Sequence, residues 1–317
     1  MSPAPELDPD RFAVHHFDGR GFRQAYVREN AGGVPLLCVH GWPETKRIWW
    51  KVIAPLADAG FDVIVPDLRG FGDSDVAPDG FHDVPSHSRD LHALLTTPES
   101  EGGLGLDDVV LCGGDLGGPV IQDLALRFPE LVDRIVLFNS PLPFDRDAMA
   151  GMDTRPAAGA SDYFVRQGLD PDGLASELRT PEQRRSYIAT FYTSRFWAHP
   201  GAFTDGPAPG GPAVDFHTEP FGDGARLRAG FGAYESAFSE SARSEPALLA
   251  PNPAVETLVL FGPSDHVLYP DFDRMAATVF PRHVGPFLLR DCGHFVPWEA
   301  PHALASAIRV FCRDRLS

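Results

Sequence analysis

Cysteine is scarce in this sequence and is not arranged in pairs. The four cysteines, Cys38, Cys112, Cys292 and Cys312, are spread over 317 residues without CxxC spacing. Disulfide-stabilised domains and zinc sites both place cysteines at shorter, recurring intervals. The sequence therefore predicts reduced, mostly buried thiols, with neither a disulfide framework nor a metal site.

Basic residues and long apolar runs are also in short supply. Lysine and arginine total 27 against 44 aspartates and glutamates, and the formal net charge is −17. This balance argues against a nucleic-acid partner, which would need clustered positive charge. No apolar stretch approaches the roughly 20 residues of a membrane helix, and the acidic, proline-rich N-terminus is unlike a signal peptide. We expect a cytoplasmic protein with no membrane span and a small ligand.

The sequence does contain short apolar runs that alternate with amphipathic segments. After a predicted hairpin (12–18 and 22–29), buried strands are expected within 35–41, 61–70, 107–114, 133–141, 256–265 and 285–294. These runs are apolar throughout, which is typical of strands that are buried on both faces. Helical patterns lie between them, including 47–60, 85–97 and 119–128. The sequence predicts an α/β fold with a mostly parallel central sheet flanked by helices.

One long stretch interrupts this alternation. Residues 142–253 show no strong strand pattern, but they contain helical patterns at 181–197 and 225–238 and a Pro/Gly-rich loop at 201–216 that we expect to be mobile. The predicted organisation is a core in two parts, 1–141 and 254–317, with an α-helical cap (142–253) inserted between two late strands. Ligands of open parallel sheets bind beyond the carboxyl ends of the strands, so such a cap would close over the site.

The segment LCGGDLGGP (111–119) places one carboxylate, Asp115, among glycines. By itself, an aspartate beside glycines is ordinary turn or helix-cap chemistry. Here a predicted strand precedes it, and a helix follows that has Pro119 in the favoured first turn. This context favours a nucleophile elbow of the form G-x-nucleophile-x-G, in which small residues permit a strained turn and the helix N-terminus stabilises negative charge.

Together with this elbow, four other segments resemble the α/β-hydrolase superfamily and its epoxide hydrolase branch, which is close to the haloalkane and fluoroacetate dehalogenases. They are HGWP (40–43), DLRGFGDSD (67–75), GPSDHV (262–267) and DCGHFVPWEAP (291–301), so the resemblance covers nearly the whole chain. It implies an α/β-hydrolase fold with Asp115 as nucleophile, Asp265 as triad acid and His294 as base, in the chain order of this fold. The backbone N–H groups of Trp42 and Leu116 would form the oxyanion hole.

An aspartate in place of the usual serine determines the type of reaction. A carboxylate with an unperturbed pKa of about 3.9 is already ionised at pH 7 and can displace a leaving group at a saturated carbon. The product is an alkyl ester of Asp115, which is then hydrolysed by water that His294 activates. Asp265 would orient the imidazole and stabilise its cationic form. The expected substrate is therefore an alkyl electrophile, either an epoxide or an alkyl halide.

The residue after the nucleophile helps to separate these two substrate classes. Haloalkane dehalogenases commonly supply a tryptophan there and fluoroacetate dehalogenases supply arginines just after it, whereas this chain has Leu116. Epoxide hydrolases use two cap tyrosines to polarise the ring oxygen. The segment FGAYESAF (231–238) resembles the second of these and favours Tyr234. SDYFVRQG (161–168) resembles the first in a looser register and indicates Tyr163, while Tyr187 and Tyr192 are assigned to packing.

The sequence therefore predicts an epoxide hydrolase that uses no cofactor and acts on a small apolar epoxide and water. The alternative is a haloalkane or haloacid dehalogenase with the same nucleophile, and a second alternative is a non-catalytic hydrolase-like receptor. A homodimer, the identity of the epoxide and the metabolic role are left open. We also expect His40 to support the oxyanion loop by hydrogen bonds, and Asp67 and Arg69 to tie down the loop after their strand.

Overall fold

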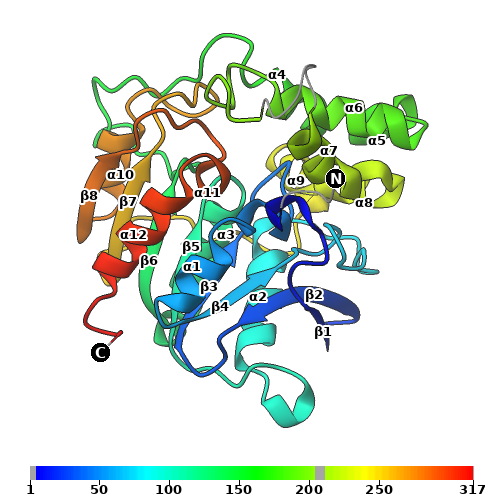
Figure 1. The fold of residues 1–317 in the computed structure, drawn as a ribbon. Coiled ribbons are helices and arrows are strands. Elements are labelled where there is room, and N and C mark those ends of the chain that lie inside the picture. Colours follow the sequence, from blue (N-terminus) through cyan, green and yellow to red (C-terminus); the bar gives the residue numbers. More distant parts are fainter. Residues whose placement is uncertain (1–4, 204–210, 317) are drawn as a thin grey trace.

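The computed structural model describes residues 5–203 and 211–316, and its centre is an eight-stranded sheet (Figure 1). The strands are β1 (Val14–Gly19), β2 (Phe22–Glu29), β3 (Val34–Val39), β4 (Phe61–Pro66), β5 (Val109–Gly113), β6 (Val132–Phe138), β7 (Glu256–Phe261) and β8 (His283–Leu288). Their order in the sheet is β1-β2-β4-β3-β5-β6-β7-β8. The pairs β1–β2 and β2–β4 are antiparallel and the pairs from β4 to β8 are parallel. The prediction of an opening hairpin followed by a mostly parallel sheet is confirmed.

Helices cover both faces of this sheet. The core helices are α1 (Ile53–Asp58), α2 (Val84–Thr96), α3 (Gly117–Arg127), α10 (Phe272–Val279), α11 (Val296–Glu299) and α12 (Pro301–Phe311), with 3-10 turns η1 (Pro5–Leu7), η2 (Lys46–Trp49), η3 (Glu99–Glu101) and η4 (Pro129–Leu131). The connection through α1 runs from β3 to β4, and the connection through α3 runs from β5 to β6 in the opposite direction across the sheet. Right-handed crossovers therefore place α1 and α3 on opposite faces. In agreement, α1 packs on β2, β4 and α12, whereas α3 packs on β3, β5, β6 and α2.

The pattern at 47–60, predicted to be one helix, forms two elements. The turn η2 ends at Trp49, and α1 begins only at Ile53. Pro55 explains the interruption, because a proline inside a helix lacks its N–H and clashes with the carbonyl four residues earlier. It is tolerated in a first turn, which is where α1 places it. The segment ends at Gly60 with a left-handed φ of +101°, as the sequence indicates.

The helices that lie between β6 and β7 gather at one end of the sheet (Figure 1). They are α4 (Asp162–Leu169), α5 (Pro171–Glu177), α6 (Pro181–Tyr192), α7 (Pro212–Thr218), α8 (Gly224–Gly230) and α9 (Gly232–Phe238), with turns η5 (Glu219–Gly222) and η6 (Glu240–Ala242). In the described residues of this insertion, 139–203 and 211–255, no strand is present. The insertion is thus helical and consistent with a cap, while the limits 142–253 stay a prediction.

Several details of the insertion and of the last strand differ from the sequence pattern. The single helix expected at 225–238 is divided at Phe231, between Gly230 and Gly232, into α8 and α9. The expected mobile loop lies partly in 204–210, outside the described residues, and its last residues belong to α7, which Pro212 begins. The strand expected at 285–294 ends at Leu288, and Asp291 turns the chain with a φ of +56°.

The carboxyl ends of the parallel strands determine where the candidate site lies. In the sheet, β4 lies on one side of β3, and β5, the next strand in the chain, lies on the other side of β3. The direction in which successive strands are added therefore reverses at the β3–β5 pair. Ligands of open α/β sheets bind at such a reversal. HGWP follows β3 and the elbow follows β5, while the next strands are followed by Asn139, Asp265 and His294.

All four cysteines are unpaired and buried, as predicted. None of the helices in the described part of the chain has both the length and the apolar character needed to cross a bilayer.

Candidate active site

Asp115 occupies the tight turn between β5 and α3. Its φ of +45° is left-handed, a conformation that costs a non-glycine residue on the order of 1–3 kcal/mol. Its backbone N–H donates to the Asn139 carbonyl oxygen (2.8 Å). A Cβ at Gly114 would lie 2.3 Å from the Phe138 ring, and one at Gly117 would lie 2.5 Å from the Val39 carbonyl oxygen. The glycines beside Asp115 are therefore required by the close approach of neighbouring strands.

The structure brings together the three residues predicted as nucleophile, base and acid. His294 Nε2 lies 3.1 Å from Asp115 Oδ2, and His294 Nδ1 lies 2.7 Å from Asp265 Oδ2. All three residues are buried, although Asp115 also lines a cavity. They are supplied by the segments that follow β5, β7 and β8, so the sheet is what assembles them.

The two carboxylates control the charge of His294. Burial alone would lower the pKa of the imidazole, but the negative charge of Asp265 and the hydrogen bonds to Asp115 and Asp265 raise it well above the usual value. With both carboxylates ionised, the imidazole is held as an imidazolium. Loss of the Asp115 charge removes part of this stabilisation, so the pKa of His294 falls and the neutral ring, which can act as a base, becomes more populated.

The loop after β3 supplies an N–H group to Asp115. The Trp42 backbone N–H donates to Asp115 Oδ1 (2.6 Å). Leu116, the second predicted donor, is the N-cap residue of α3, and its side chain lines the cavity. A Cβ at Gly41 would lie 2.4 Å from the Asp115 Cβ, so only glycine permits this approach. The structure thus places both predicted oxyanion residues beside Asp115.

Two buried side chains hold this loop in place. The Leu68 N–H donates to His40 Nε2 (3.0 Å), and His40 Nδ1 must therefore carry the proton that it donates to the Gly41 carbonyl (2.8 Å). This confirms the predicted support by His40. Glu44, which the sequence analysis missed, accepts the Gly41 N–H at Oε2 (2.6 Å). Burial and the Asp115 charge raise the pKa of Glu44 to about 8.

Two further polar residues that the sequence analysis did not assign hold the acid and the base. Asn139 Nδ2 donates to Asp265 Oδ2 (2.9 Å), and Asn139 Oδ1 accepts the Gly262 N–H (2.9 Å). Glu299 accepts the N–H groups of Gly293 (2.8 Å) and Phe295 (2.9 Å) on either side of His294. Asn139 lies near the end of a predicted strand segment (133–141), and Glu299 lies in the last motif (291–301). Their positions in the sequence therefore gave a signal, although the residues they bind could not be predicted.

The loop after β4 is held by ion pairs, as predicted for Asp67 and Arg69. Asp67 pairs with Lys46 (2.6 Å) and also accepts the Lys46 and Asp73 N–H groups. Arg69 is fully buried and binds Asp90 (2.5 Å).

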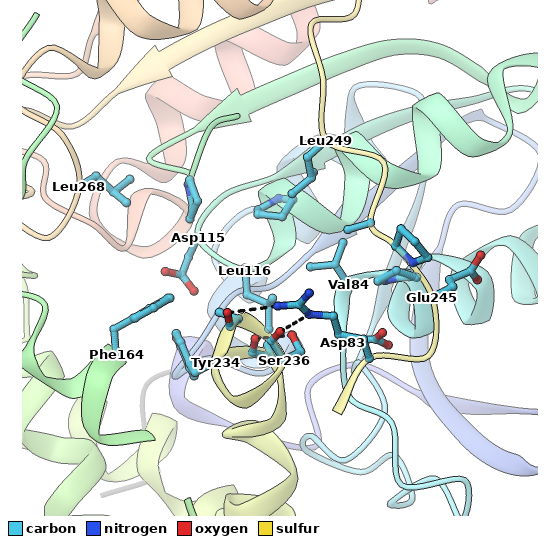
Figure 2. A pocket seen from close by; sticks show the side chains of 18 of the residues that line it. Asp83, Val84, Asp115, Leu116, Phe164, Tyr234, Ser236, Glu245, Leu249 and Leu268 are labelled. Atoms are coloured by element: carbon cyan, nitrogen blue, oxygen red, sulfur yellow. Dashed lines mark hydrogen bonds between the residues drawn. The ribbon is translucent and has the colours of Figure 1, made fainter. Parts of the chain in front are cut away.

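A cavity of about 520 Å³ with a mainly apolar lining opens beside Asp115. Figure 2 shows Asp115, Phe164 and Tyr234 near one another and Asp83 and Glu245 farther along the cavity. Both predicted tyrosines, Tyr163 from α4 and Tyr234 from α9, line the cavity together with Asp115.

The two tyrosines are packed on the Trp42 indole. The Tyr163 ring stacks on it (5.4 Å between centroids, 4° between planes), and the Tyr234 ring meets it edge to face (5.4 Å, 86°). Burial, together with the Asp115 charge, raises the pKa of both phenols well above the usual value, so both stay protonated donors. Tyr187 and Tyr192, the two tyrosines that were assigned to packing, lie outside the cavity lining. The Tyr187 hydroxyl accepts a hydrogen bond from Gln167 (2.9 Å), and the Tyr192 hydroxyl donates one to the Pro43 carbonyl (2.6 Å). In residues 5–203 and 211–316, no cluster of three or more His, Cys, Asp or Glu side chains is arranged to hold a metal ion.

Comparison with known proteins extends this description. Residues 34–301 match the family model described as "alpha/beta hydrolase fold". A soluble epoxide hydrolase from Corynebacterium sp. is 38% identical over 119 residues, which is 38% of either chain. The bifunctional epoxide hydrolase 2 of Sus scrofa is 29% identical over 55% of this chain and 31% of its own length. The chain thus matches only about a third of the length of these two relatives.

Other similarities extend over nearly the whole chain. Haloalkane dehalogenase 2 of Mycobacterium tuberculosis is 30% identical over 97% of both chains. The solved structure "Epoxide hydrolase CorEH without ligand" superposes with a TM-score of 0.76 over 96% of this chain and 99% of that one, at 24% identity, which supports the fold alone. With a family model that matches most of its length and a relative that matches nearly all of it, this chain belongs to the α/β-hydrolase fold family.

Proposed function

We propose that this protein is a cofactor-independent epoxide hydrolase. The observation that carries the proposal is that Asp115 lines one cavity with two protonated phenols, Tyr163 and Tyr234, while His294 contacts the same carboxylate. A carboxylate nucleophile, two donors for an oxygen leaving group and a base for hydrolysis are the groups that epoxide opening and ester hydrolysis need.

In the first step Asp115 attacks one epoxide carbon. A C–O bond to the carboxylate forms as the ring C–O bond breaks, and the ring oxygen takes a proton from a phenol. The raised pKa values of Tyr163 and Tyr234 keep both protons available at neutral pH. The enzyme then carries a neutral hydroxyalkyl ester and one tyrosinate.

In the second step water adds to the ester carbonyl. Alkylation has removed the Asp115 charge, so the pKa of His294 falls, the imidazolium releases a proton to solvent, and the neutral ring then accepts a proton from the attacking water. The Trp42 N–H, which now meets Asp115 Oδ1, would stabilise the tetrahedral oxyanion; loss of one such donor typically costs about 2.7–4 kcal/mol. The ester C–O bond breaks, His294 protonates the leaving alkoxide, and the Asp115 carboxylic acid returns a proton to the tyrosinate. His294 then regains a proton from solvent as the Asp115 charge is restored. A vicinal diol is released.

A dehalogenase is the second candidate, because the dehalogenase relative matches 97% of the chain at 30% identity. A halide needs N–H donors around its departure site. In this chain Leu116 follows the predicted nucleophile, and Trp42 does not line the cavity. The tyrosine hydroxyls suit an alkoxide better, which favours the epoxide. The presence of Asp115, His294 and Asp265 in contact argues against a receptor without catalysis.

Mass spectrometry of His294→Gln would test this assignment. Incubated with panels of epoxides and haloalkanes, the variant should trap an ester on Asp115 whose mass equals protein plus intact epoxide. An adduct formed only with haloalkanes, lacking the halogen, would assign the dehalogenase instead. Full turnover by Asp115→Asn, once deamidation is ruled out, would contradict both enzymes and any mechanism through this carboxylate.

A further inference from the structure

We infer that the cavity takes substrates that carry a carboxylate, which Arg243 binds at the end of an apolar chain. This inference rests on the proposed function, since it names a class of epoxide for the same site. Arg243 is the one cationic side chain among the described residues that line the cavity holding Asp115 and Tyr234.

Arg243 is held in position by neutral groups. Its Nε donates to the Ser236 carbonyl oxygen (2.6 Å) and its Nη2 to the Ala237 carbonyl oxygen (3.3 Å), both in the last turn of α9. Arginine often binds the carbonyls at a helix C-terminus in this way, which orients the guanidinium without neutralising it. Throughout 5–203 and 211–316, no carboxylate forms an ion pair with Arg243, and its Nη1 makes no hydrogen bond.

The acidic residues in the same cavity wall are already engaged. Asp83 caps α2 through the Ser86 N–H (3.2 Å) and accepts both the N–H (2.6 Å) and the hydroxyl of Ser244. Glu245 pairs with Arg127 (2.7 Å) and Arg89. Arg243 is therefore the one cation among the described residues of the cavity lining, and no counter-ion among them neutralises it. The carboxylates of Asp83 and Glu245 favour a ligand with one negative charge over a phosphate, because they would repel the second negative charge of a phosphate.

The remaining lining is suited to a hydrocarbon chain. The cavity lining also includes Leu116, Pro119, Pro141, Leu249 and Leu268. A ligand that reacts at Asp115 and reaches Arg243 would thus bury an apolar segment between an epoxide and a carboxylate. The guanidinium would act in binding and orientation and take no part in bond making.

Binding of matched ligands without an epoxide tests the subsite apart from the reaction. Arg243 is solvent-exposed, so calorimetric titration should find octanoate bound no more than about fivefold more tightly than octanamide, as expected for an exposed charge pair. Arg243→Gln should abolish this preference and Arg243→Lys should retain part of it. Arg282→Gln serves as the control, because Arg282 also binds a backbone carbonyl (Ala254, 2.7 Å) but does not line the cavity. Equal binding of the two ligands by the wild type would overturn the inference, even if the Arg243 variants failed to fold.

Kinetics separate this inference from the proposed function. With ω-epoxy carboxylic acids and the matching primary amides, the wild type should show a KM about fivefold lower for the acid, and an optimum chain length that reflects the separation of Asp115 and Arg243. Turnover of both without preference would remove the carboxylate subsite and leave the epoxide hydrolase intact. An Arg243-dependent preference for octanoate without any epoxide turnover would keep the subsite and reject the epoxide hydrolase.

Discussion

Asn139 donates a hydrogen bond from its side-chain amide to the Asp265 carboxylate, with Nδ2 2.9 Å from Oδ2, across 126 residues of sequence. The two residues follow the neighbouring strands β6 and β7, between which the helical insertion lies. The chain therefore leaves the sheet for the insertion after β6 and returns to it at β7, and this hydrogen bond joins the segments that follow the two strands. Through it, Asn139 fixes Asp265, the acid that contacts His294.

Replacing Asn139 with alanine should loosen Asp265. We expect a loss of about 1–3 kcal/mol in the free energy of unfolding, since the buried Gly262 N–H loses its acceptor and Asp265 loses one donor, and a fall in kcat because His294 is less well held. Asn30→Ala is a matched control, since Asn139 (φ +34°) and Asn30 (φ +61°) are both left-handed and both donate to backbone carbonyls, and Asn30 lies far along the chain from the site. It should lower stability without changing kcat. Equal kcat values for the two variants would contradict this role.

Glu299 is expected to hold the loop that carries His294. Glu299→Ala would leave the buried N–H groups of Gly293, Phe295 and His199 without an acceptor. We expect unfolding in urea to show a loss of about 2–4 kcal/mol, together with a lower kcat. Glu299→Gln keeps one acceptor oxygen and should fall between wild type and alanine. If Glu299→Gln lost as much stability and kcat as Glu299→Ala, the negative charge of Glu299, and not its hydrogen bonds, would be what holds the loop.

Glu44 should make stability decline with rising pH. Its pKa is about 8 in the folded chain against an ordinary 4.5, so between these values the folded state keeps a proton that the unfolded state has released. The free energy of unfolding then falls as pH rises, by at most about 1.4 kcal/mol per pH unit. Glu44→Gln lacks this contribution. Thermal unfolding between pH 5 and pH 8 should show the stability of Glu44→Gln increasing relative to that of the wild type as pH rises. Parallel stability curves for the two proteins would refute the raised pKa of Glu44.

The two chemical steps should respond differently to pH. In the free enzyme His294 is an imidazolium, and alkylation of Asp115 does not require its deprotonation. Hydrolysis does require a neutral ring, and the pKa of His294 in the ester is lower than in the free enzyme because the Asp115 charge is gone. As pH falls through that value, hydrolysis should slow and the ester should accumulate. Rapid acid quench and intact mass at pH 5 and pH 8 would measure the ester fraction, which should be larger at pH 5.

The cavity tyrosines should govern ring opening. Tyr234→Phe and Tyr163→Phe each remove one proton donor, and we expect the rate of ester formation to drop by about 10²-fold or more for the residue that protonates the oxygen. Tyr187→Phe is the control, because Tyr187 bonds to Gln167 outside the cavity lining. Stopped-flow tryptophan fluorescence would report the alkylation phase. Unchanged alkylation in the double Tyr163→Phe, Tyr234→Phe variant would remove both phenols from the mechanism.

Much of the fold could be predicted from sequence because the signals are local. Apolar strands buried on both faces, the glycines around Asp115 and each individual motif reflect residues within a few positions of one another. The same local view joined 47–60 into one helix and extended the last strand to 294. Pro55, which a helix tolerates only in its first turn, divides the first segment into η2 and α1, and the last strand ends at Leu288, before the left-handed turn at Asp291.

The sequence by itself determined that Asp115 lies in a strand–turn–helix elbow and that Asp265 and His294 follow later strands, since these depend on local backbone geometry. Only the tertiary structure decided that Asn139 holds Asp265, that Glu44 becomes a protonated acid under the oxyanion loop and that Arg243 faces the cavity of Asp115. Each of these depends on which distant segments the sheet order and the helical insertion bring into contact, and on how fully that contact removes water. No residue pattern along one segment encodes such a contact, because its partner lies tens to hundreds of residues away and its strength depends on burial.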